Sequence, residues 1–144
     1  MTINVKKLNN SAKLPFRATE HSAGADLFAF LEAPITLEPS QRLLIPTGIS
    51  VEIPTGYGGF VFPRSSLSSK HGITLSNCVG VIDADYRGEV KVALVNHSNE
   101  PYIINNGERI AQMVIMPVEV PNFIETDELS DTDRGIGGFG STGL

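Results

Sequence analysis

The chain has 144 residues, of which 41% are hydrophobic, and a formal net charge of −5. This length is typical of one domain, and the composition is typical of a folded globular protein. The sequence contains no run of 18 apolar residues, so no membrane span is predicted. The acidic balance argues against a broad nucleic-acid-binding surface, which needs a basic stripe. We therefore expect no membrane partner and no nucleic-acid partner.

The amino-terminal segment and the cysteine content indicate the compartment. Residues 1–7 lack the long apolar stretch of a secretory signal. The single cysteine, Cys78, cannot form an internal disulfide, and no Cys/His cluster has the spacing of a zinc site. We therefore expect a cytoplasmic protein in which Cys78 is a small packed residue.

Short β-branched segments separated by turn residues dominate the chain. They predict strands at residues 42–45, 48–53, 59–62, 90–95 and 109–116. One short helix is expected over residues 65–71, with Gly72 placed to end it. Many short strands at fairly even spacing predict an all-β single domain, built as a sandwich, a jelly roll or a barrel.

In chain order, the first polar positions that could carry chemistry are Asp26 and the stretch after residue 62. Asp26 begins an apolar strand, where it could cap a turn or support a metal–triphosphate complex. Arg64 follows a predicted strand, and Ser65 and Ser66 open the short helix. A guanidinium beside helix N–H groups can bind oxyanions. The alternative is an ordinary serine cap beside a surface arginine.

Two further places in the second half of the chain, residues 80–89 and Gln112, carry polar groups that could take part in chemistry. Residues 80–89 place Asp83 and Asp85 between glycines. At strand spacing the two carboxylates share a face, so one could orient a water while the other pairs with Arg87 or another base. The alternative is a polar hairpin tip. Gln112 lies in an apolar strand, where a buried amide needs partners and either is satisfied structurally or faces a ligand.

After Phe123 the character of the chain changes. Residues 125–133 hold five acids, and residues 134–144 hold five glycines. Neither stretch can pack a core, so we expect a β domain over residues 1–124 and a flexible, mobile arm over residues 125–144. The arm could be a solubilising tail. However, its arginine, phenylalanine and hydroxyl residues are suited to hold an aromatic phosphorylated ligand, and its glycines let backbone N–H groups approach anionic oxygens.

Five segments, taken in order, resemble the motifs of the trimeric dUTPase family and together span nearly the whole chain. They are residues 23–27, 63–66, 77–88, 107–112 and 134–143. The resemblance implies a jelly-roll-like β-barrel that assembles into a homotrimer. It also implies active sites between subunits, with the carboxyl-terminal arm closing over the site of a neighbouring subunit.

The resemblance further implies an activity. The substrate would be dUTP, which would be hydrolysed with Mg²⁺ to dUMP and pyrophosphate. This reaction would keep uracil out of DNA and supply dUMP for thymidylate synthesis. Asp83 would position the water that attacks the α-phosphate. Asp26 would lie in the outer shell of the Mg²⁺ ion, linked to it through water. The other residues implied to be catalytic are Arg64, Gln112 and Arg134.

The resemblance assigns the substrate contacts as well. Tyr86 would stack on the deoxyribose and exclude a 2′-hydroxyl, while Phe139 would stack on uracil. Uracil would be read by Asn77 and by the hairpin backbone around Val81 and Ile82, with Lys91 at the border of that pocket. The phosphates would be held at Arg64, Ser65, Ser66 and Gln112, and from the arm at Arg134, Gly140, Ser141 and Thr142. Ser66 stands where the family commonly has glycine, so the local fit there differs from that of other members.

Two other functions are weighed against this one. The string Arg-Ser-Ser-Leu at residues 64–67 also resembles dCTP deaminase, a relative with the same fold. The arm over residues 134–143 and the stretch 82–86 fit the hydrolase better. The third hypothesis is a jelly-roll binding or shell protein without chemistry, and neither Asp83 nor Gln112 gives a reason to prefer it.

Overall fold

The computed structural model describes residues 1–138, and this part of the chain is all-β apart from one short helix. Its elements, in order, are β1 (Asn4–Lys7), β2 (Ala25–Phe28), β3 (Ile35–Leu37), β4 (Arg42–Pro46), β5 (Ile49–Glu52), β6 (Tyr57–Phe62), α1 (Ser65–His71), β7 (Ile73–Leu75), β8 (Gly80–Ile82), β9 (Lys91–Asn96), β10 (Tyr102–Ile104) and β11 (Arg109–Pro117). The predicted fold class is confirmed. The strands that the sequence pattern did not resolve are short ones, such as the three-residue β3, β7 and β10.

Helix α1 has the predicted bounds, and its two ends have different chemistry. Gly72 adopts the left-handed conformation with φ 67°, and its N–H faces the carbonyl oxygens of Leu67 and Ser68. At the other end the N-cap is Arg64, whose side chain makes no capping hydrogen bond. Ser65 is therefore the first residue of the helix rather than its cap. No helix within residues 1–138 is long and apolar enough to span a bilayer.

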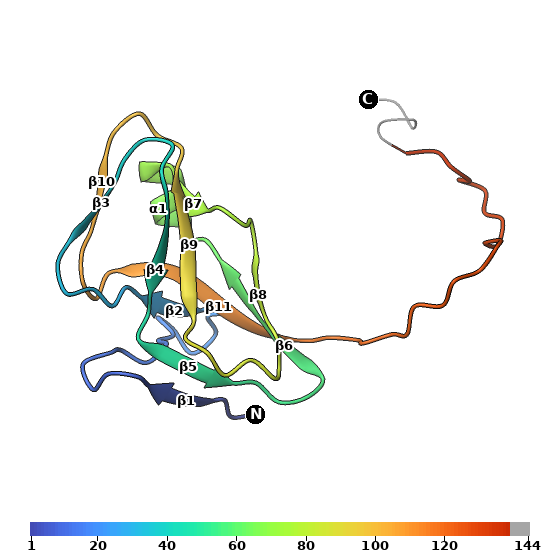
Figure 1. Ribbon diagram of the computed structural model, residues 1–144, viewed down its shortest axis with the longest axis horizontal. Helices are drawn as coiled ribbons and strands as arrows, with labels where there is room; N and C mark the ends of the chain where they lie inside the picture. The colour runs from blue at the N-terminus through green and yellow to red at the C-terminus, as the bar shows by residue number, and fades with distance from the viewer. Residues whose placement is uncertain (139–144) are drawn as a thin grey trace.

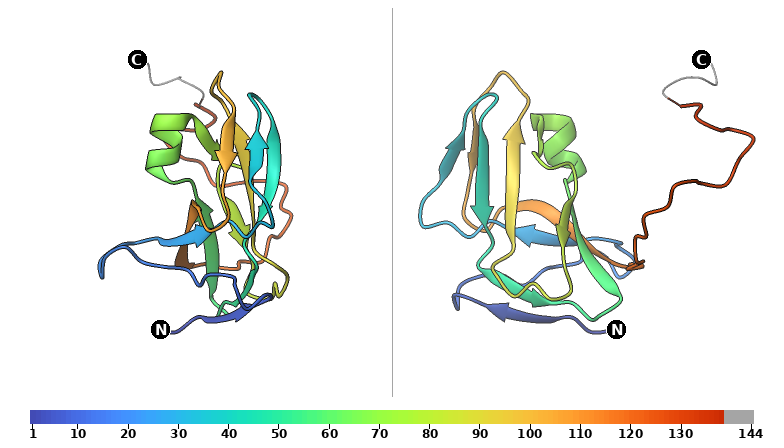
Figure 2. Two further views of the ribbon diagram at one scale, coloured as in Figure 1. Left: turned by 90° about the vertical axis from the view of Figure 1, so that its left-hand side faces the viewer. Right: turned by 45° about the vertical axis from the view of Figure 1, so that its right-hand side comes forward.

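Within residues 1–138 the strands pair only in antiparallel fashion and form four small sheets (Figure 1). Their strand orders are β1-β5, β10-β3, β2-β11-β6-β8 and β4-β9-β7. Strands β4 and β9 run across the direction of β2 and β11, as Figure 2 shows. The sheets share one hydrophobic core, whose fully buried side chains include Leu27, Leu37, Ile45, Leu94 and Ile110.

Strand β11 lies at the centre of the four-stranded sheet, between β2 and β6. Its register with β2 shifts between Arg109, which is paired with Phe28, and Ala111, which is paired with Leu27. Two steps along β11 therefore match one step along β2, as in a β-bulge. Ile110 and Ala111 are consequently both buried although they are consecutive in sequence.

Residues 118–138 form no helix or strand and leave the domain at the end of β11 (Figure 1). The backbone N–H of Val118 still donates to the carbonyl oxygen of Gly56, at 3.0 Å. Farther along, the apolar side chains of Val120, Phe123 and Ile124 are exposed. A segment with its apolar side chains in solvent adds little to the core. The division near residue 124 and the mobility of the arm nevertheless stay predictions.

Candidate functional site

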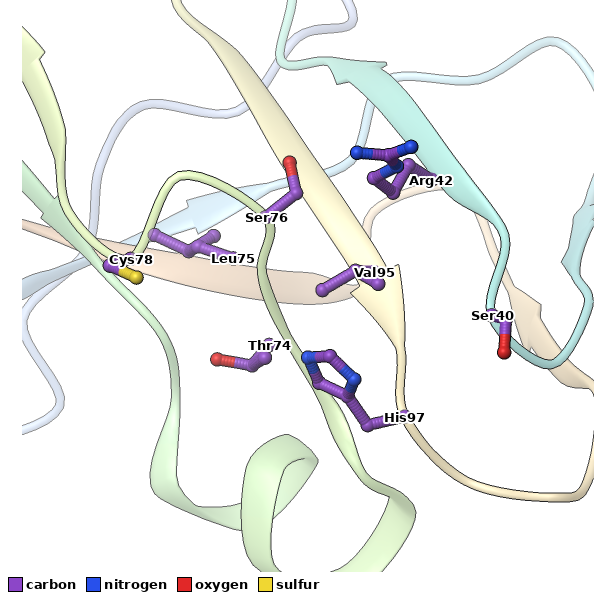
Figure 3. Close-up of a pocket in the computed structure, with 8 residues that line it drawn as sticks. All are labelled: Ser40, Arg42, Thr74, Leu75, Ser76, Cys78, Val95 and His97. Atoms are coloured by element: carbon purple, nitrogen blue, oxygen red, sulfur yellow. The ribbon is translucent and has the colours of Figure 1, made fainter.

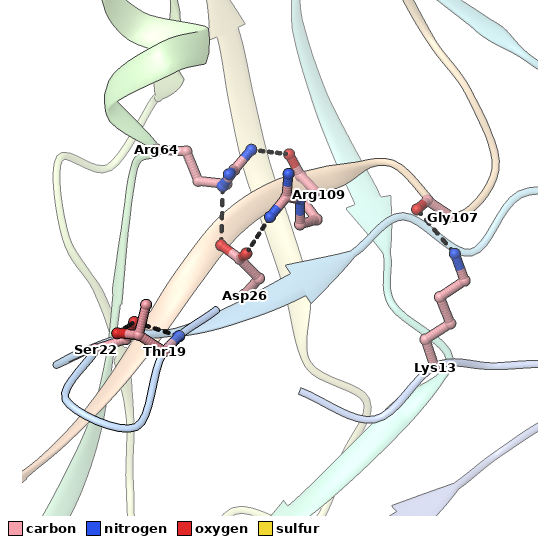
Figure 4. Close-up of polar contacts among 7 residues, drawn as sticks. All are labelled: Lys13, Thr19, Ser22, Asp26, Arg64, Gly107 and Arg109. Atoms are coloured by element: carbon pink, nitrogen blue, oxygen red, sulfur yellow. Dashed lines mark hydrogen bonds and ion pairs between the residues drawn. The ribbon is translucent and has the colours of Figure 1, made fainter. Parts of the chain in front are cut away.

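Asp26, in β2, is the centre of a cluster of charged side chains (Figure 4). Only 8% of its surface is exposed. The Nε of Arg64 donates to Asp26 Oδ1 at 2.8 Å, and the Nη1 of Arg109 donates to Asp26 Oδ2 at 3.1 Å. Arg64 Nη1 also donates to the carbonyl oxygen of Arg109, at 3.3 Å. Because two guanidinium groups share one carboxylate, the cluster carries a surplus positive charge that suits an anionic ligand.

The backbone around Asp26 is fixed on both sides of β2. Asp26 faces Gln112 of β11 in the strand register. On the other edge it exchanges two backbone hydrogen bonds with Phe16, at 2.7 and 3.1 Å. The loop between them is closed by Thr19 and Ser22, whose hydroxyl oxygens lie 2.9 Å apart (Figure 4). The carboxylate of Asp26 is thus presented from a well-paired strand.

A cavity of about 300 Å³ opens beside this cluster. Its lining consists of Ala18, Ser22, Ala23, Gly24, Asp26, Arg64, Ser65 and Gln112. We call it the Asp26 cavity. The Nε2 of Gln112 donates to the carbonyl oxygen of Pro63 at 3.0 Å, so the amide, which is half-buried rather than buried, is partly satisfied within the protein. The structure therefore brings together four predicted site residues from three separate stretches of sequence: Asp26, Arg64, Ser65 and Gln112.

A second cavity lies on the other side of Arg64 and is also lined by Ser66 and Arg109. At its edge the Nζ of Lys13 donates to the carbonyl oxygen of Gly107 at 3.2 Å (Figure 4). The hydroxyl of Tyr102 donates to the carboxylate of Glu108. Burial, followed by this hydrogen bond to Glu108, raises the pKa of Tyr102 above its ordinary value. Ser66 thus faces a different opening from Ser65, with Arg64 between the two.

Asp83 lies in neither of these cavities. With Val81 and Ile82 it lines a groove at the far end of β6, which we call the Asp83 groove. The register of β8 on β6 pairs Ile82 with Gly59, so Asp83 is level with residue 58, whereas Arg64 comes six residues later. At the rise of an extended strand this separation is roughly 20 Å. Within one chain, Asp83 and Arg64 therefore cannot contact the same phosphate.

The prediction that Asp83 and Asp85 share a strand face is wrong. Strand β8 ends at Ile82, and the backbone N–H of Tyr86 donates to the carbonyl oxygen of Asp83 at 3.2 Å, which closes a turn. A turn ends the alternation of side chains that a strand would impose. Arg87 pairs with neither aspartate. It donates to the carbonyl oxygens of Ala84 and Tyr86, at 2.7 and 3.0 Å, and lies 3.8 Å from Glu52.

The remaining predicted substrate contacts surround this turn without sharing one cavity. The ring of Tyr86 lies over Gly88, and its hydroxyl donates to the carbonyl oxygen of Glu89 at 3.0 Å. Lys91 forms an ion pair with Glu89 at 3.6 Å. Asn77 is exposed at the start of the segment that leads into β8. Asn77, Tyr86 and Lys91 line neither the Asp26 cavity nor the Asp83 groove.

The arm is only partly described. The Nε of Arg134 donates to the carbonyl oxygen of Gly137 at 2.7 Å, within the arm itself. Arg134 is exposed and lines neither the Asp26 cavity nor the Asp83 groove. The predicted contacts at Phe139, Gly140, Ser141 and Thr142 lie outside the described residues.

The prediction that Cys78 is packed is wrong, because the residue is exposed and has φ 62°. It lines another cavity, over the sheet β4-β9-β7 (Figure 3). The other residues of this cavity are Ser40, Arg42, Thr74, Leu75, Ser76, Val95 and His97. None of them was among the predicted site residues.

Arg109 is the site residue that the sequence analysis left without a role. The sequence does carry a signal for it: Ile110 and Ala111 are two consecutive apolar residues between the polar Arg109 and Gln112. In a regular strand Arg109 and Gln112 would point to opposite faces, because they are three residues apart. The bulge at residue 110 removes this mismatch, so that both side chains reach the surroundings of Asp26.

Comparisons with known proteins show the family of this chain. The sequence model of the dUTPase family matches residues 10–143. The deoxyuridine 5′-triphosphate nucleotidohydrolase of Finegoldia magna is 54% identical, over 98% of this chain and 99% of that protein. The protein of the same name from Desulfitobacterium hafniense is 52% identical, over 94% of this chain and 91% of that protein.

Solved structures show the same fold. The dUTPase of Staphylococcus bacteriophage 80alpha with dUpNHpp superposes with a TM-score of 0.85, at 32% identity, over 99% of both chains. A mutant dUTPase from phage phi11 of S. aureus, whose structure reveals the coordination of a structural Mg(II) ion, gives a TM-score of 0.82 at 28% identity. That superposition covers 91% of this chain and 100% of the phage chain.

Proposed function

The chain belongs to the dUTPase family and is an enzyme that hydrolyses dUTP, and from this premise we propose which residues bind the substrate and which act in the reaction. The products are dUMP and pyrophosphate. By removing dUTP, the reaction keeps uracil out of DNA, and the dUMP that it forms supplies thymidylate synthesis. The observation that carries the proposal is the Asp26 cavity, where residues from three of the family's motif segments meet. Arg64 and Ser65 come from the second, Gln112 from the fourth and Asp26 from the first.

The Asp26 cavity is proposed to hold the triphosphate. Its surplus positive charge offsets part of the substrate's negative charge, and Arg64 keeps N–H groups beyond those that bond to Asp26 and Arg109. Gln112 supplies an amide from the neighbouring strand. Ser65 supplies a hydroxyl group and a backbone N–H group at the start of α1, and Ser66 is proposed to bind from the neighbouring cavity on the other side of Arg64.

Asp83 is proposed to orient the water that attacks the α-phosphate. Its side chain is exposed in the Asp83 groove, and among residues 1–138 it takes part in no ion pair. A free carboxylate can accept the proton of the attacking water. As the water's oxygen bonds to the α-phosphorus, the bond to the bridging oxygen breaks and pyrophosphate leaves.

The uracil and the deoxyribose are proposed to lie against the turn that follows β8. Tyr86 stacks on the sugar, where its ring leaves no room for a 2′-hydroxyl. Asn77 and the backbone around Val81 and Ile82 read the base, and Lys91 borders this pocket. The arm completes the site, with Arg134, Gly140, Ser141 and Thr142 on the phosphates and Phe139 on the base.

The roughly 20 Å between Asp83 and Arg64 supports an assembly in which different chains supply the two halves of each site. A cyclic homotrimer achieves this, because each subunit then presents its Asp83 groove to the Asp26 cavity of a neighbour and every copy is equivalent. The arm, which leaves the domain in Figure 1, is proposed to close over a neighbouring site in the same assembly.

Mg²⁺ is proposed as the cofactor. Within residues 1–138 no three His, Cys, Asp or Glu side chains gather where they could hold a metal ion. Asp26 is the carboxylate that lines the cavity, and both of its oxygens are occupied by arginines. This donor set fits a metal held by the triphosphate and waters, with Asp26 in its outer shell. When bound, the ion neutralises charge on the phosphates during transfer.

The experiment that tests the proposal mixes two variants, Asp83→Asn and Arg64→Gln, each carrying a different affinity tag. Each variant alone should be nearly inactive in pyrophosphate release from dUTP. When the two are co-assembled in equal amounts, about a quarter of all sites, and about a third of those in trimers that contain both variants, should receive intact residues from both chains, so activity should return. Mixed assemblies are isolated by purification over both tags.

Two controls make the outcome decisive. Co-assembly of two differently tagged copies of Asp83→Asn should stay inactive. The wild type should release pyrophosphate from dUTP but hardly from UTP, dCTP or dTTP. If doubly purified assemblies of the two variants stay inactive, the two halves do not come from different chains. Ammonia release from dCTP would instead favour the deaminase.

A further inference from the structure

The bulge in β11 gives Arg109 a place in the cluster that no assigned role explains. Asp26 has two carboxylate oxygens, and each receives one arginine, Arg64 on Oδ1 and Arg109 on Oδ2. Arg109 also accepts a hydrogen bond from Arg64 at its carbonyl oxygen. The side chain and the backbone of one residue thus fix both partners of the ion pair (Figure 4).

From this geometry we propose that Arg109 is a positioning residue for phosphate binding, acting through Asp26 on Arg64. The inference rests on the proposed role of Arg64 in holding the triphosphate. Arg109 occupies Oδ2 of Asp26, so Arg64 is held by one nitrogen instead of the two that carboxylate–arginine pairs often use. The outer N–H groups of Arg64 consequently stay available for the phosphates.

Removal of Arg109 has a defined consequence in this arrangement. Both oxygens of Asp26 become free to take two N–H groups of Arg64 in a bidentate pair. That pairing turns the guanidinium toward the protein and withdraws donors from the cavity. The side chain of Arg109 is about half exposed, at 45%, so its loss leaves no buried charge of its own and should not prevent folding.

A double-mutant cycle tests the inference. The four proteins are the wild type, Arg109→Gln, Arg64→Lys and the double variant, and the readout is the Kd of a non-hydrolysable imido analogue of dUTP, measured by calorimetry with Mg²⁺. We expect each single change to weaken binding about tenfold, since each removes a charge-assisted hydrogen bond. In the Arg64→Lys background, Arg109→Gln should add less than about a threefold effect, because its target is already gone.

Two further variants separate positioning from structure. Arg109→Lys keeps one donor for Asp26 Oδ2 and should recover most of the affinity, which a loss of fold would not allow. Arg42→Gln removes an exposed arginine outside the proposed site and should leave the Kd within about twofold of the wild type. Thermal unfolding of every variant is measured alongside.

The outcomes are distinguishable. If the changes in binding free energy caused by Arg109→Gln and Arg64→Lys simply add, Arg109 acts on the phosphates by direct contact or through its electrostatic field. The positioning role is then overturned, while the proposed function stands. If Arg109→Gln leaves the Kd unchanged, the positioning role also fails. If Arg64→Lys alone leaves the Kd unchanged, the proposed role of Arg64 fails, and this inference fails with it.

Discussion

Gly24 faces the side-chain amide of Gln112 with no space for a Cβ between them. The amide cannot simply move aside, because its Nε2 is bonded to the carbonyl oxygen of Pro63 at 3.0 Å. Glycine is thus required here by the close approach of the neighbouring strand, as it is wherever a backbone must come near another group. The position of Gln112 in the Asp26 cavity depends on that glycine.

Gly24→Ala should lower kcat/KM for dUTP by roughly 10- to 100-fold, because a small displacement of a substrate-positioning group is costly in rate. Steady-state pyrophosphate release gives the kinetic values, and thermal unfolding reports any loss of stability. In a Gln112→Ala background the same change should have little further effect, since the displaced amide is absent. Full activity of Gly24→Ala would show that the amide is not needed where it lies.

Gly88→Ala should weaken the discrimination between dUTP and UTP. A methyl group at position 88 meets the ring and hydroxyl of Tyr86, so the ring must leave its place and its hydrogen bond to Glu89. If that ring excludes the 2′-hydroxyl, the ratio of kcat/KM for dUTP to that for UTP should fall by about tenfold or more. The kcat/KM values for the two substrates are measured at the same Mg²⁺ concentration. An unchanged ratio would remove the role given to Tyr86.

Ending the chain at Asp133 should leave assembly and thermal stability nearly unchanged while turnover falls by about two orders of magnitude. The hydrogen bonds of Arg134, Gly135 and Gly137 stay within the arm, so their loss exposes no core. Turnover should fall because the arm closes the site and excludes bulk water during the reaction. Size-exclusion chromatography, thermal unfolding and dUTP turnover check the three expectations. A truncated chain with full activity would contradict them.

Tyr102 should make the protein less stable in alkali. Its pKa is raised in the folded state, first by burial and then by the hydrogen bond to Glu108. The unfolded chain therefore loses this proton more readily, and the stabilisation, complete below a pH of about 10, is lost as the pH rises above it. Tyr102→Phe lacks this dependence. Urea unfolding at pH 8 and pH 11 should thus show a larger decrease in the free energy of unfolding for the wild type than for the variant.

Much of the fold was predictable because its signals are local. Short β-branched segments between turn residues gave the all-β class, and Gly72 marked the end of α1 at the residue where the left-handed conformation occurs. Local signals failed where the chain turns. The two-residue spacing of Asp83 and Asp85 suggested one face, but the strand had already ended at Ile82.

By itself, the sequence determined the fold class, the helix and the family, together with the residue types that the chemistry needs. Only the tertiary structure decided which of them meet. Arg109 reaches Asp26, 83 residues earlier in the chain, through a bulge whose place depends on how β11 packs against β2. Asp83 and Arg64 are kept apart by the length of β6. Pairing and register between distant strands are set by the shared core rather than by local periodicity, so no local pattern could reveal them.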